Sequence, residues 1–288
     1  MIDKTIAGPT VTEHELSEIK ALIEKRSGIL FDSSRERFFS LRVREHMGAK
    51  KVAHGTDLVR LMKNSNVEYD TLVERLLTQE TSFFRYPSIY HALEKKVLPE
   101  MHMKKFWENP RSLRIWSAGC ATGEEPYSIA MTICDSIEFA EAWNINIVAT
   151  DISRKALAVA EAGLYPRREV EAIGLKAEAH FTKSGDQYIV RPKIRNMVSF
   201  AQMNLAQTVY MGRFDIIFCM NVMIYFSEER RGALIQRFYE YLEPGGYLFV
   251  GHAESVAKLP VKFDTTTHGD CILYQKPGVG AARKAAGD

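Results

Sequence analysis

The sequence predicts an α/β fold, in which a mostly parallel sheet carries helices on both faces, with a small antiparallel β insertion and an all-α N-terminal domain in front. Three observations support this prediction. The first ninety residues place apolar side chains at helical spacing. From about Arg111, short apolar runs alternate with helical segments, a pattern typical of a covered parallel sheet. Residues 164–203 break that alternation with polar, β-rich pieces.

The helical N-terminal domain is predicted to span residues 1–90. Thr12 and Glu15 have the spacing of a capping box, and Gly28 is placed to end the helix that they begin. No strand pattern interrupts this region, so we expect it to be entirely helical. Further helices are expected at about 34–48, after Thr56, and across 72–77.

The second domain is predicted to span residues 91–276. Its strand candidates are 113–117, 145–150, 214–219, 246–250 and 272–275, and its helices are expected at 126–138, 153–162 and 228–242. The antiparallel insertion is expected at about 164–203, with strand pieces at 180–182, 188–190 and 198–200. Residues 277–288, "PGVGAARKAAGD", are expected to form a flexible tail.

The composition is that of an ordinary globular protein, with 46% apolar and 26% charged residues. No apolar run approaches the roughly 20 residues that a membrane span needs, and "MIDKTIAGPT" has no signal-peptide core. The four cysteines lie far apart, without metal-ligand spacing. We therefore expect a cytoplasmic protein without a metal site or membrane insertion.

The stretch "WSAGCATGEEPYSIA" (116–130) raises the central question about function. Its turn reads G-x-x-x-G, and acids rather than a phosphate-binding pattern open the next helix. Glu125 could complete a capping box with Thr122, which would leave Glu124 free to face a ligand. A pyrophosphate beside Glu124 would be repelled by ~4 kcal/mol for each unit charge pair at 4 Å, with an effective dielectric near 20. The acids favour a cationic ligand, and the missing G-x-G-x-x-G argues against a nicotinamide dehydrogenase.

A second carboxylate, Asp151, ends the strand candidate "NIVATD". A carboxylate at this place commonly binds ribose hydroxyls, but Asp151 could equally cap a helix that begins near Ser153. Ligands of open α/β sheets lie beyond the carboxyl ends of the strands. A ligand with a ribose and a positive charge but no phosphate fits S-adenosylmethionine.

The chain resembles the S-adenosylmethionine-dependent methyltransferases through "LEPGGYLFVGH" (242–252). More narrowly, it is similar to the bacterial chemotaxis receptor methyltransferases (CheR-like protein-glutamate O-methyltransferases). The matching stretches are "LTQETSFFR" (77–85), "GEEPYSIA" (123–130) and "FDIIFCMNVMIYF" (214–226), within a resemblance that covers about 12–276. It implies a Rossmann-like methyltransferase domain that converts S-adenosylmethionine to S-adenosylhomocysteine and forms glutamate methyl esters on methyl-accepting chemotaxis receptors.

The resemblance also implies the residues of the site. Those expected to contact the cofactor are Gln79, Thr81, Arg85, Glu124, Asp151, Asn204, Leu205, Met220 and Asn221. Arg85 and Tyr225 are expected at the reaction centre. Family members often carry Asn in place of Gln79 and Arg in place of Met220. A backbone contact at position 220 would survive that difference, whereas a side-chain contact would not.

The expected reaction needs no general base, because a glutamate side chain has a reference pKa of about 4.3 and is ionised at pH 7. The anionic carboxylate and the sulfonium lose charge toward the transition state, so alignment and partial exclusion of water supply most of the catalysis. We expect Arg85 to hold one carboxylate oxygen only loosely, because a tight clamp would weaken the nucleophile.

A basic stretch on the predicted second helix is a candidate docking surface. Its arginines are Arg35, Arg37, Arg42 and Arg44. Residues seven apart share a helix face, and we expect Phe38 and Leu41 to turn toward the core. The stretch could be an ordinary solvated face, or it could dock on the glutamate-rich helices of a receptor. The sequence has no DNA-binding motif or aromatic stacking platform beside it, which argues against nucleic acid.

In some members of the family, the β insertion binds the C-terminal tail of a receptor, which an added strand at a sheet edge would explain. Two other functions share the same cofactor site. One is methylation of a small carboxylic acid or amine, which would need no basic helix. The other is a non-catalytic signalling adaptor that binds S-adenosylmethionine, against which the presence of Arg85 and Tyr225 argues.

Overall fold

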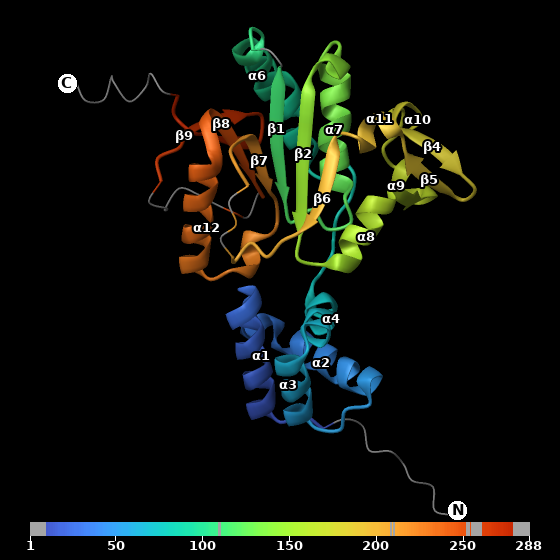
Figure 1. Cartoon of the computed structure of the whole chain (residues 1–288), viewed down its shortest axis with the longest axis vertical. Coiled ribbons are helices and arrows are strands. Elements are labelled where there is room, and N and C mark those ends of the chain that lie inside the picture. The colour runs from blue at the N-terminus through green and yellow to red at the C-terminus, as the bar shows by residue number, and fades with distance from the viewer. Residues whose placement is uncertain are drawn as a thin grey trace, which may run out of the picture. The chain divides into compact units, whose positions relative to one another are not determined.

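Figure 1 shows the computed structural model of the chain, which describes residues 10–108, 111–207, 209, 211–251, 254 and 261–278. The chain forms two compact units, Met1–Thr78 with Tyr225–Arg230, and Gln79–Ile224 with Arg231–Asp288. The boundary lies ahead of residue 90, because Phe83, Ile89 and Tyr90 are buried in the core of the second unit. Most of the expected tail, residues 279–288, lies outside the described residues.

The first unit is helical, as the sequence predicts. Its main helices are α1 (Glu13–Ser27), α2 (Glu36–Lys50), α3 (Gly55–Asn64) and α4 (Asn66–Leu76). The capping box is confirmed, since the Thr12 hydroxyl accepts from the Glu15 N–H and the Glu15 carboxylate accepts from the Thr12 N–H. Gly28 ends α1 with a φ of +81°, in the left-handed region that favours glycine.

A run of helix at the start of the second unit is absent from the sequence prediction. It comprises α5 (Pro87–Ala92), the π-helical turn η2 (Leu93–Val97) and α6 (Leu98–Lys105). Pro99 lies in the first turn of α6, where its missing N–H would have no helical partner in any case. Leu93, Val97 and Leu98 are buried, so the run contributes one side of the core.

The second unit is built on a seven-stranded sheet with the order β6-β2-β1-β7-β8-β10-β9. Neighbouring strands from β6 to β8 pair in parallel, and β10 pairs antiparallel with β8 and β9. The strands are β1 (Ser112–Ala118), β2 (Asn144–Asp151), β6 (Val198–Gln202), β7 (Phe214–Cys219), β8 (Leu242–Val250), β9 (Asp264–His268) and β10 (Cys271–Gln275). The carboxyl ends of β1, β2, β6, β7 and β8 therefore lie along one edge.

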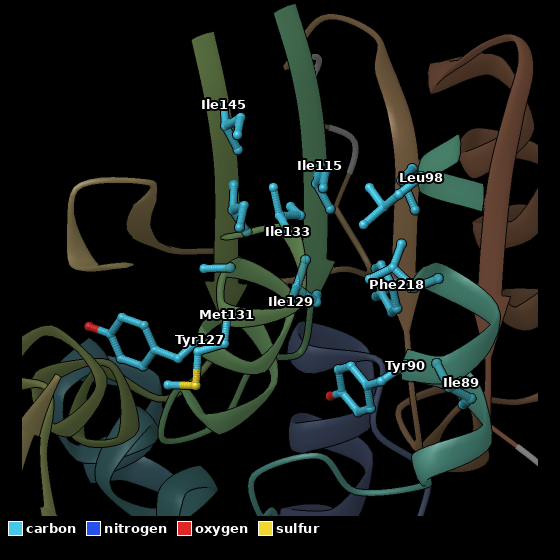
Figure 2. Packing of buried hydrophobic residues seen from close by; sticks show 14 of the residues in the cluster. Ile89, Tyr90, Leu98, Ile115, Tyr127, Ile129, Met131, Ile133, Ile145 and Phe218 are labelled. Atoms are coloured by element: carbon cyan, nitrogen blue, oxygen red, sulfur yellow. The ribbon is translucent and has the colours of Figure 1, made fainter. Parts of the chain in front are cut away.

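Helices cover both faces of this sheet. Ile115 of β1 belongs to the core formed with α5, α6 and α7 (Glu124–Ser136), and Figure 2 shows it near Ile129 and Ile133 of α7. Trp116, the next residue, faces the opposite side, where its ring centroid lies 5.2 Å from that of Phe238 in α12 (Glu228–Tyr241). On the side of Ile115 and α7, α8 (Arg154–Ala162) packs near β2 and β6, with Leu157 against Ala149. The predicted fold class is confirmed.

The antiparallel insertion is smaller than expected. Its sheet has the order β3-β5-β4, from β3 (Leu164–Pro166), β4 (Phe181–Ser184) and β5 (Gln187–Val190), accompanied by α9 (Arg167–Glu171), α10 (Lys176–His180) and α11 (Pro192–Arg195). Placing 198–200 in the insertion is wrong, because these residues belong to β6, parallel to β2 in the main sheet. β6 is an edge strand with mostly exposed positions, so its sequence lacks the apolar run of a buried strand.

None of the helices described has both the length and the apolar character needed to span a membrane. In the same part of the chain, all four cysteines are free thiols, and His, Cys, Asp and Glu form no group of three or more that could hold a metal ion.

Candidate cofactor and active site

The loop after β1 depends on two glycines. Gly119 and Gly123 have φ values of +85° and +99°, in the region that L side chains rarely adopt. A Cβ on Gly119 would lie 2.3 Å from the Val222 Cγ2 atom, so the loop after β7 packs directly against this turn. A Cβ on Gly123 would lie 2.7 Å from the Ala160 Cβ atom of α8. The loop is therefore held between the ends of β7 and α8.

The expected capping box of Thr122 and Glu125 is wrong. Gly123 is the N-cap of α7 and has no side chain to accept a hydrogen bond. The Thr122 hydroxyl instead contacts both Glu124 carboxylate oxygens, at 2.9 and 2.8 Å. Glu125 accepts a 2.6 Å hydrogen bond at Oε1 from the Ser117 hydroxyl at the end of β1. Both acids are thus anchored by hydroxyl groups rather than by helix capping.

Burial raises the pKa of both acids. Glu124 is only 4% exposed, and burial is the main cause of its raised pKa, which hydrogen bonds from Thr122 and Thr81 partly offset. Burial raises the pKa of Glu125 to about 7; the Ser117 hydrogen bond lowers it, the nearby Glu254 raises it, and Arg85 lowers it. A cation next to this pair would favour the charged form of both carboxyls.

Asp151 joins the end of β2 to the glycine loop. Its Oδ2 atom accepts from the Ala121 N–H at 2.9 Å, and its Oδ1 atom accepts from the Ser153 N–H at 2.8 Å. Burial raises its pKa, and these amide hydrogen bonds oppose that effect. The alternative in which Asp151 caps α8 is wrong, because Ser153 is the N-cap and accepts from the Ala156 N–H.

The segment that enters the second unit lies along this edge. The Gln79 side chain donates from Nε2 to the Ser153 hydroxyl at 3.0 Å, which places it beside the end of β2. Thr81 lies near enough to Glu124 for its hydroxyl to lower the pKa of that carboxyl slightly. Arg85 is partly buried; its Nη1 atom donates to the Glu80 carbonyl, and its guanidinium carbon lies 5.2 Å from the Tyr86 ring centroid.

The remaining cofactor candidates follow β6 and β7. The Met203 N–H donates to the Asp151 carbonyl at 2.9 Å, so Asn204 and Leu205 start beside the end of β2. Leu205 is buried, and the Asn204 side chain accepts from the Ala206 N–H at 2.9 Å. After β7, Met220 packs against the main core, while Asn221 has a φ of +58° and donates its N–H to the Glu254 carboxylate at 2.9 Å.

Unusual backbone conformations concentrate at this edge. Six described non-glycine residues have positive φ, and four of them are Phe84, Tyr86, Ala121 and Asn221. Such conformations cost roughly 1–3 kcal/mol each and cluster at functional sites. Polar groups hold three of the four in place: the Phe84 N–H donates to the Ser128 hydroxyl at 2.9 Å, Asp151 holds Ala121, and Glu254 holds Asn221. The strain supports this edge as the functional site.

The structure adds four buried or partly buried polar residues that sequence reasoning missed, namely Ser117, Ser128, Ser153 and Glu254. Ser128 lies four residues after Glu124, whose carbonyl accepts its hydroxyl at 2.6 Å, so helical spacing could have drawn attention to it. Glu254 has no comparable signal, because its partners lie near residue 221 and the two segments meet only in the folded sheet.

Tyr225 belongs to the first unit. Its carbonyl accepts from the Leu30 N–H at 2.8 Å, and its ring centroid lies 4.8 Å from the Arg35 guanidinium carbon. Arg35 also lies 5.0 Å from the Phe31 ring centroid. This expected catalytic residue is therefore packed with one of the expected docking arginines.

The basic helix differs in orientation from the expectation. Leu41 is 55% exposed and Phe38 is only partly buried, whereas Phe39 and Val43 face the core. The apolar residues that face the core are thus offset by one or two positions from those expected. Arg42 forms a 2.8 Å ion pair with Glu45.

Comparison with known proteins identifies the family. Residues 79–270 match the family model described as "CheR methyltransferase, SAM binding domain". The chain belongs to the CheR methyltransferase family. It is 33% identical over 275 residues to a chemotaxis protein methyltransferase of Vibrio parahaemolyticus, covering 92% of this chain and 98% of the relative. Chemotaxis protein methyltransferase 1 of Pseudomonas aeruginosa is 33% identical over 266 residues, with 89% and 95% covered.

A third relative has similar identity. The chemotaxis protein methyltransferase of Borreliella burgdorferi is 32% identical over 253 residues, covering 85% of this chain and 89% of the relative. The resemblance read from the sequence is confirmed, and the protein is a methyltransferase. The matched model is that of an S-adenosylmethionine-binding domain, and it starts at Gln79, where the second unit also starts.

Proposed function

We propose that the enzyme transfers a methyl group from S-adenosylmethionine to glutamate side-chain carboxylates of methyl-accepting chemotaxis receptors in the cytoplasm. The products are glutamate methyl esters and S-adenosylhomocysteine. The main structural support is the set of carboxylates at one sheet edge, with Glu124 and Glu125 after β1 and Asp151 at the end of β2. This charge suits a cofactor with a positive group and no phosphate.

The cofactor fits the residues at this edge. Asp151 already orders the loop after β1, and its position at the end of β2 is the usual place for a ribose-binding carboxylate. Glu124 lies beside the loop, with the Thr122 hydroxyl in contact with both of its carboxylate oxygens. Asn204 and Leu205 are assigned to the adenine edge. Met220 and Asn221 are assigned to the methionine portion of the cofactor, where the backbone at 220 makes its contact without the arginine common in the family. Gln79 and Arg85 complete the contacts.

S-adenosylmethionine supplies a methyl group on a positively charged sulfur. In the transfer, a new bond forms between the substrate carboxylate oxygen and the methyl carbon, and the electron pair of the broken bond stays on sulfur. No proton moves, so no base is required. Arg85 aligns one carboxylate oxygen, while the Tyr225 hydroxyl orients the other oxygen or the methyl group. Both residues act by alignment rather than proton transfer.

Docking of the receptor is assigned to the basic helix α2. Arg37 and Arg44 are exposed, and Leu41, four residues after Arg37, is exposed between them on the same side of the helix. An apolar contact flanked by cations suits an amphipathic, glutamate-rich receptor helix. Arg35 lies against the Tyr225 ring and Arg42 pairs with Glu45, while Arg44 donates to the Val11 carbonyl and the Ser40 hydroxyl at 3.4 Å and stays exposed.

The small sheet of the insertion is a second candidate docking site. Its order leaves β4 at an edge, and Thr182, Lys183 and Ser184 of this strand are exposed. A receptor C-terminal tail would add to this edge as a further strand, using backbone hydrogen bonds. This assignment depends on the receptor having such a tail.

The decisive experiment supplies labelled S-adenosylmethionine with a tritiated methyl group to the enzyme and receptor-containing membranes. Radioactivity in protein that is released as methanol by mild base would support glutamate esters. Label that accumulates in small molecules instead would indicate a small carboxylic acid or amine as substrate. Tight binding of the cofactor without turnover on any receptor would indicate an adaptor. Calorimetric titration with S-adenosylmethionine and NAD in parallel tests the cofactor assignment.

A further inference from the structure

The Glu254 carboxylate is buried at the site edge and binds only backbone N–H groups among the hydrogen bonds described. It is 7% exposed. Its Oε2 atom accepts from the Asn221 N–H at 2.9 Å and from the Gly251 N–H at 2.8 Å. Its Oε1 atom accepts from the Ile224 N–H at 3.2 Å. Three amide donors converge on one side chain, an arrangement that suits an acceptor-only carboxylate.

These contacts join two loops at the carboxyl edge of the sheet. Asn221 and Ile224 follow β7, while Gly251 follows β8 directly. The space for the carboxylate is built into the chain, because a Cβ on Gly251 would lie 2.7 Å from the Glu254 Oε2 atom and 3.1 Å from the Asn221 backbone nitrogen. Any residue larger than glycine at 251 would therefore push the carboxylate away from its donors.

The segment that Glu254 holds is conformationally costly. Asn221 has a φ of +58°, in the left-handed region that residues other than glycine adopt only at a conformational cost. The hydrogen bonds to the Glu254 carboxylate offset that cost, because a charged acceptor strengthens a hydrogen bond. On its other side, the same loop is fixed by Val222 against Gly119. Without the carboxylate, the loop would be free to relax at Asn221.

We propose that Glu254 is a positioning residue that holds the Met220–Asn221 backbone in the conformation that binds the amino-acid portion of the cofactor. The inference rests on the proposed function, which assigns this backbone to the methionine portion of S-adenosylmethionine. Glu254 contacts the loop and not the cofactor. Its loss should therefore weaken ligands that carry the amino-acid portion and spare those that lack it.

The test compares two ligands on three variants. S-adenosylhomocysteine carries the amino-acid portion, and 5′-methylthioadenosine has the same nucleoside and sulfur without it. In Glu254→Gln, an amide NH2 replaces one acceptor oxygen and faces a backbone donor. We expect the Kd for S-adenosylhomocysteine to rise about tenfold or more and the Kd for methylthioadenosine to change less than about twofold. Glu254→Asp keeps both acceptors on a shorter side chain and should fall between.

Asp215→Asn is the matched control. Asp215 is likewise a buried carboxylate, but it lies at the start of β7, at the opposite end of the strand from Asn221. It accepts from the Arg114 N–H at 2.9 Å and pairs with Lys105 at 2.9 Å. This variant should lower the thermal midpoint and change both Kd values by the same small factor. Asp215→Asn thereby gives the result expected of a purely structural residue, which is lower stability with an unchanged ratio of the two Kd values.

The inference is overturned if Glu254→Gln weakens the two ligands by the same factor, or weakens neither while remaining folded. If Glu254→Gln fails to fold, Glu254→Asp decides by the same ratio, and an unchanged ratio refutes the proposal. Failure of the wild-type enzyme to bind S-adenosylhomocysteine would instead refute the proposed function. The two failures are therefore distinguishable.

Discussion

The buried carboxyl of Glu125 should make the stability of the second unit depend on pH near neutrality. Its pKa is raised from 4.5 to about 7, chiefly by burial. Between these values, the folded state keeps a proton that the unfolded state has lost. The free energy of unfolding contributed by this group therefore falls as pH rises through that window and levels off above about 7. At about 1.4 kcal/mol for each pKa unit, the raised pKa of Glu125 corresponds to a total loss of roughly 3 kcal/mol in the free energy of unfolding as the pH rises.

Glu125→Gln removes this titration and keeps an acceptor for the Ser117 hydroxyl. Altered hydrogen bonding in this variant changes its free energy of unfolding by the same amount at every pH. Relative to wild type, however, its free energy of unfolding should rise by roughly 2 to 3 kcal/mol between pH 5 and pH 8. The difference between the two proteins reports Glu125 together with its coupling to neighbours such as Glu254, because all groups away from it titrate alike in both.

Urea unfolding followed by tryptophan fluorescence measures this difference. Trp107, Trp116 and Trp143 all lie in the second unit, so their signal reports the unit that contains Glu125. Glu138→Gln, at an exposed site just beyond α7, is the control and should give a difference that is constant with pH. A Glu125→Gln difference that changes by less than about 0.5 kcal/mol would show that the carboxyl is hydrated in the folded protein.

Other substitutions test the reaction centre and the docking surface. Arg85→Ala should lower kcat by about a hundredfold or more with a smaller effect on cofactor Kd, and turnover near wild type would remove Arg85 from the mechanism. Tyr225→Phe should lower kcat by roughly tenfold or less, because it removes only the hydroxyl; an unchanged kcat would leave the ring as packing. The pair Arg37→Glu and Arg44→Glu should lower kcat/KM for receptor membranes by roughly ten- to a hundredfold at low salt, and less at high salt. Arg60→Glu on α3 is the control, with one charge reversed instead of two, and an equal loss per reversed charge there would point to net charge rather than docking.

The sequence predicted correctly those parts of the fold whose secondary structure is determined by interactions between residues close together in the chain. Thr12 and Glu15 begin α1 through hydrogen bonds between near neighbours, and Gly28 ends it through its own backbone conformation. The buried strands β1 and β7 are continuous apolar runs that only a covered sheet accommodates. The edge strand β9 carries exposed polar residues, so its sequence does not distinguish it from a loop, whereas the edge strand β6 was predicted as a strand but assigned to the wrong sheet.

The candidate site shows the same division. Glu124 and Asp151 stand out because acids follow strands where a phosphate site would need other residues. The predicted partner of Glu125 is wrong, because Glu125 accepts from Ser117 across the loop and forms no capping box with Thr122. Glu254 meets Asn221 only after the sheet has formed. Contacts between distant segments leave no periodic pattern in the chain.

The six residues Tyr225–Arg230 belong to a helical unit whose other members end at Thr78. A ribosome must therefore synthesise most of the polypeptide before that unit receives its last segment, which Leu30 holds by its N–H. A chimera that exchanges the helical unit between two relatives must therefore include both of its segments. A chimera that exchanges only the first 78 residues would pair a foreign set of helices with the native hexapeptide. Met1–Thr78 and Tyr225–Arg230 should therefore be exchanged together.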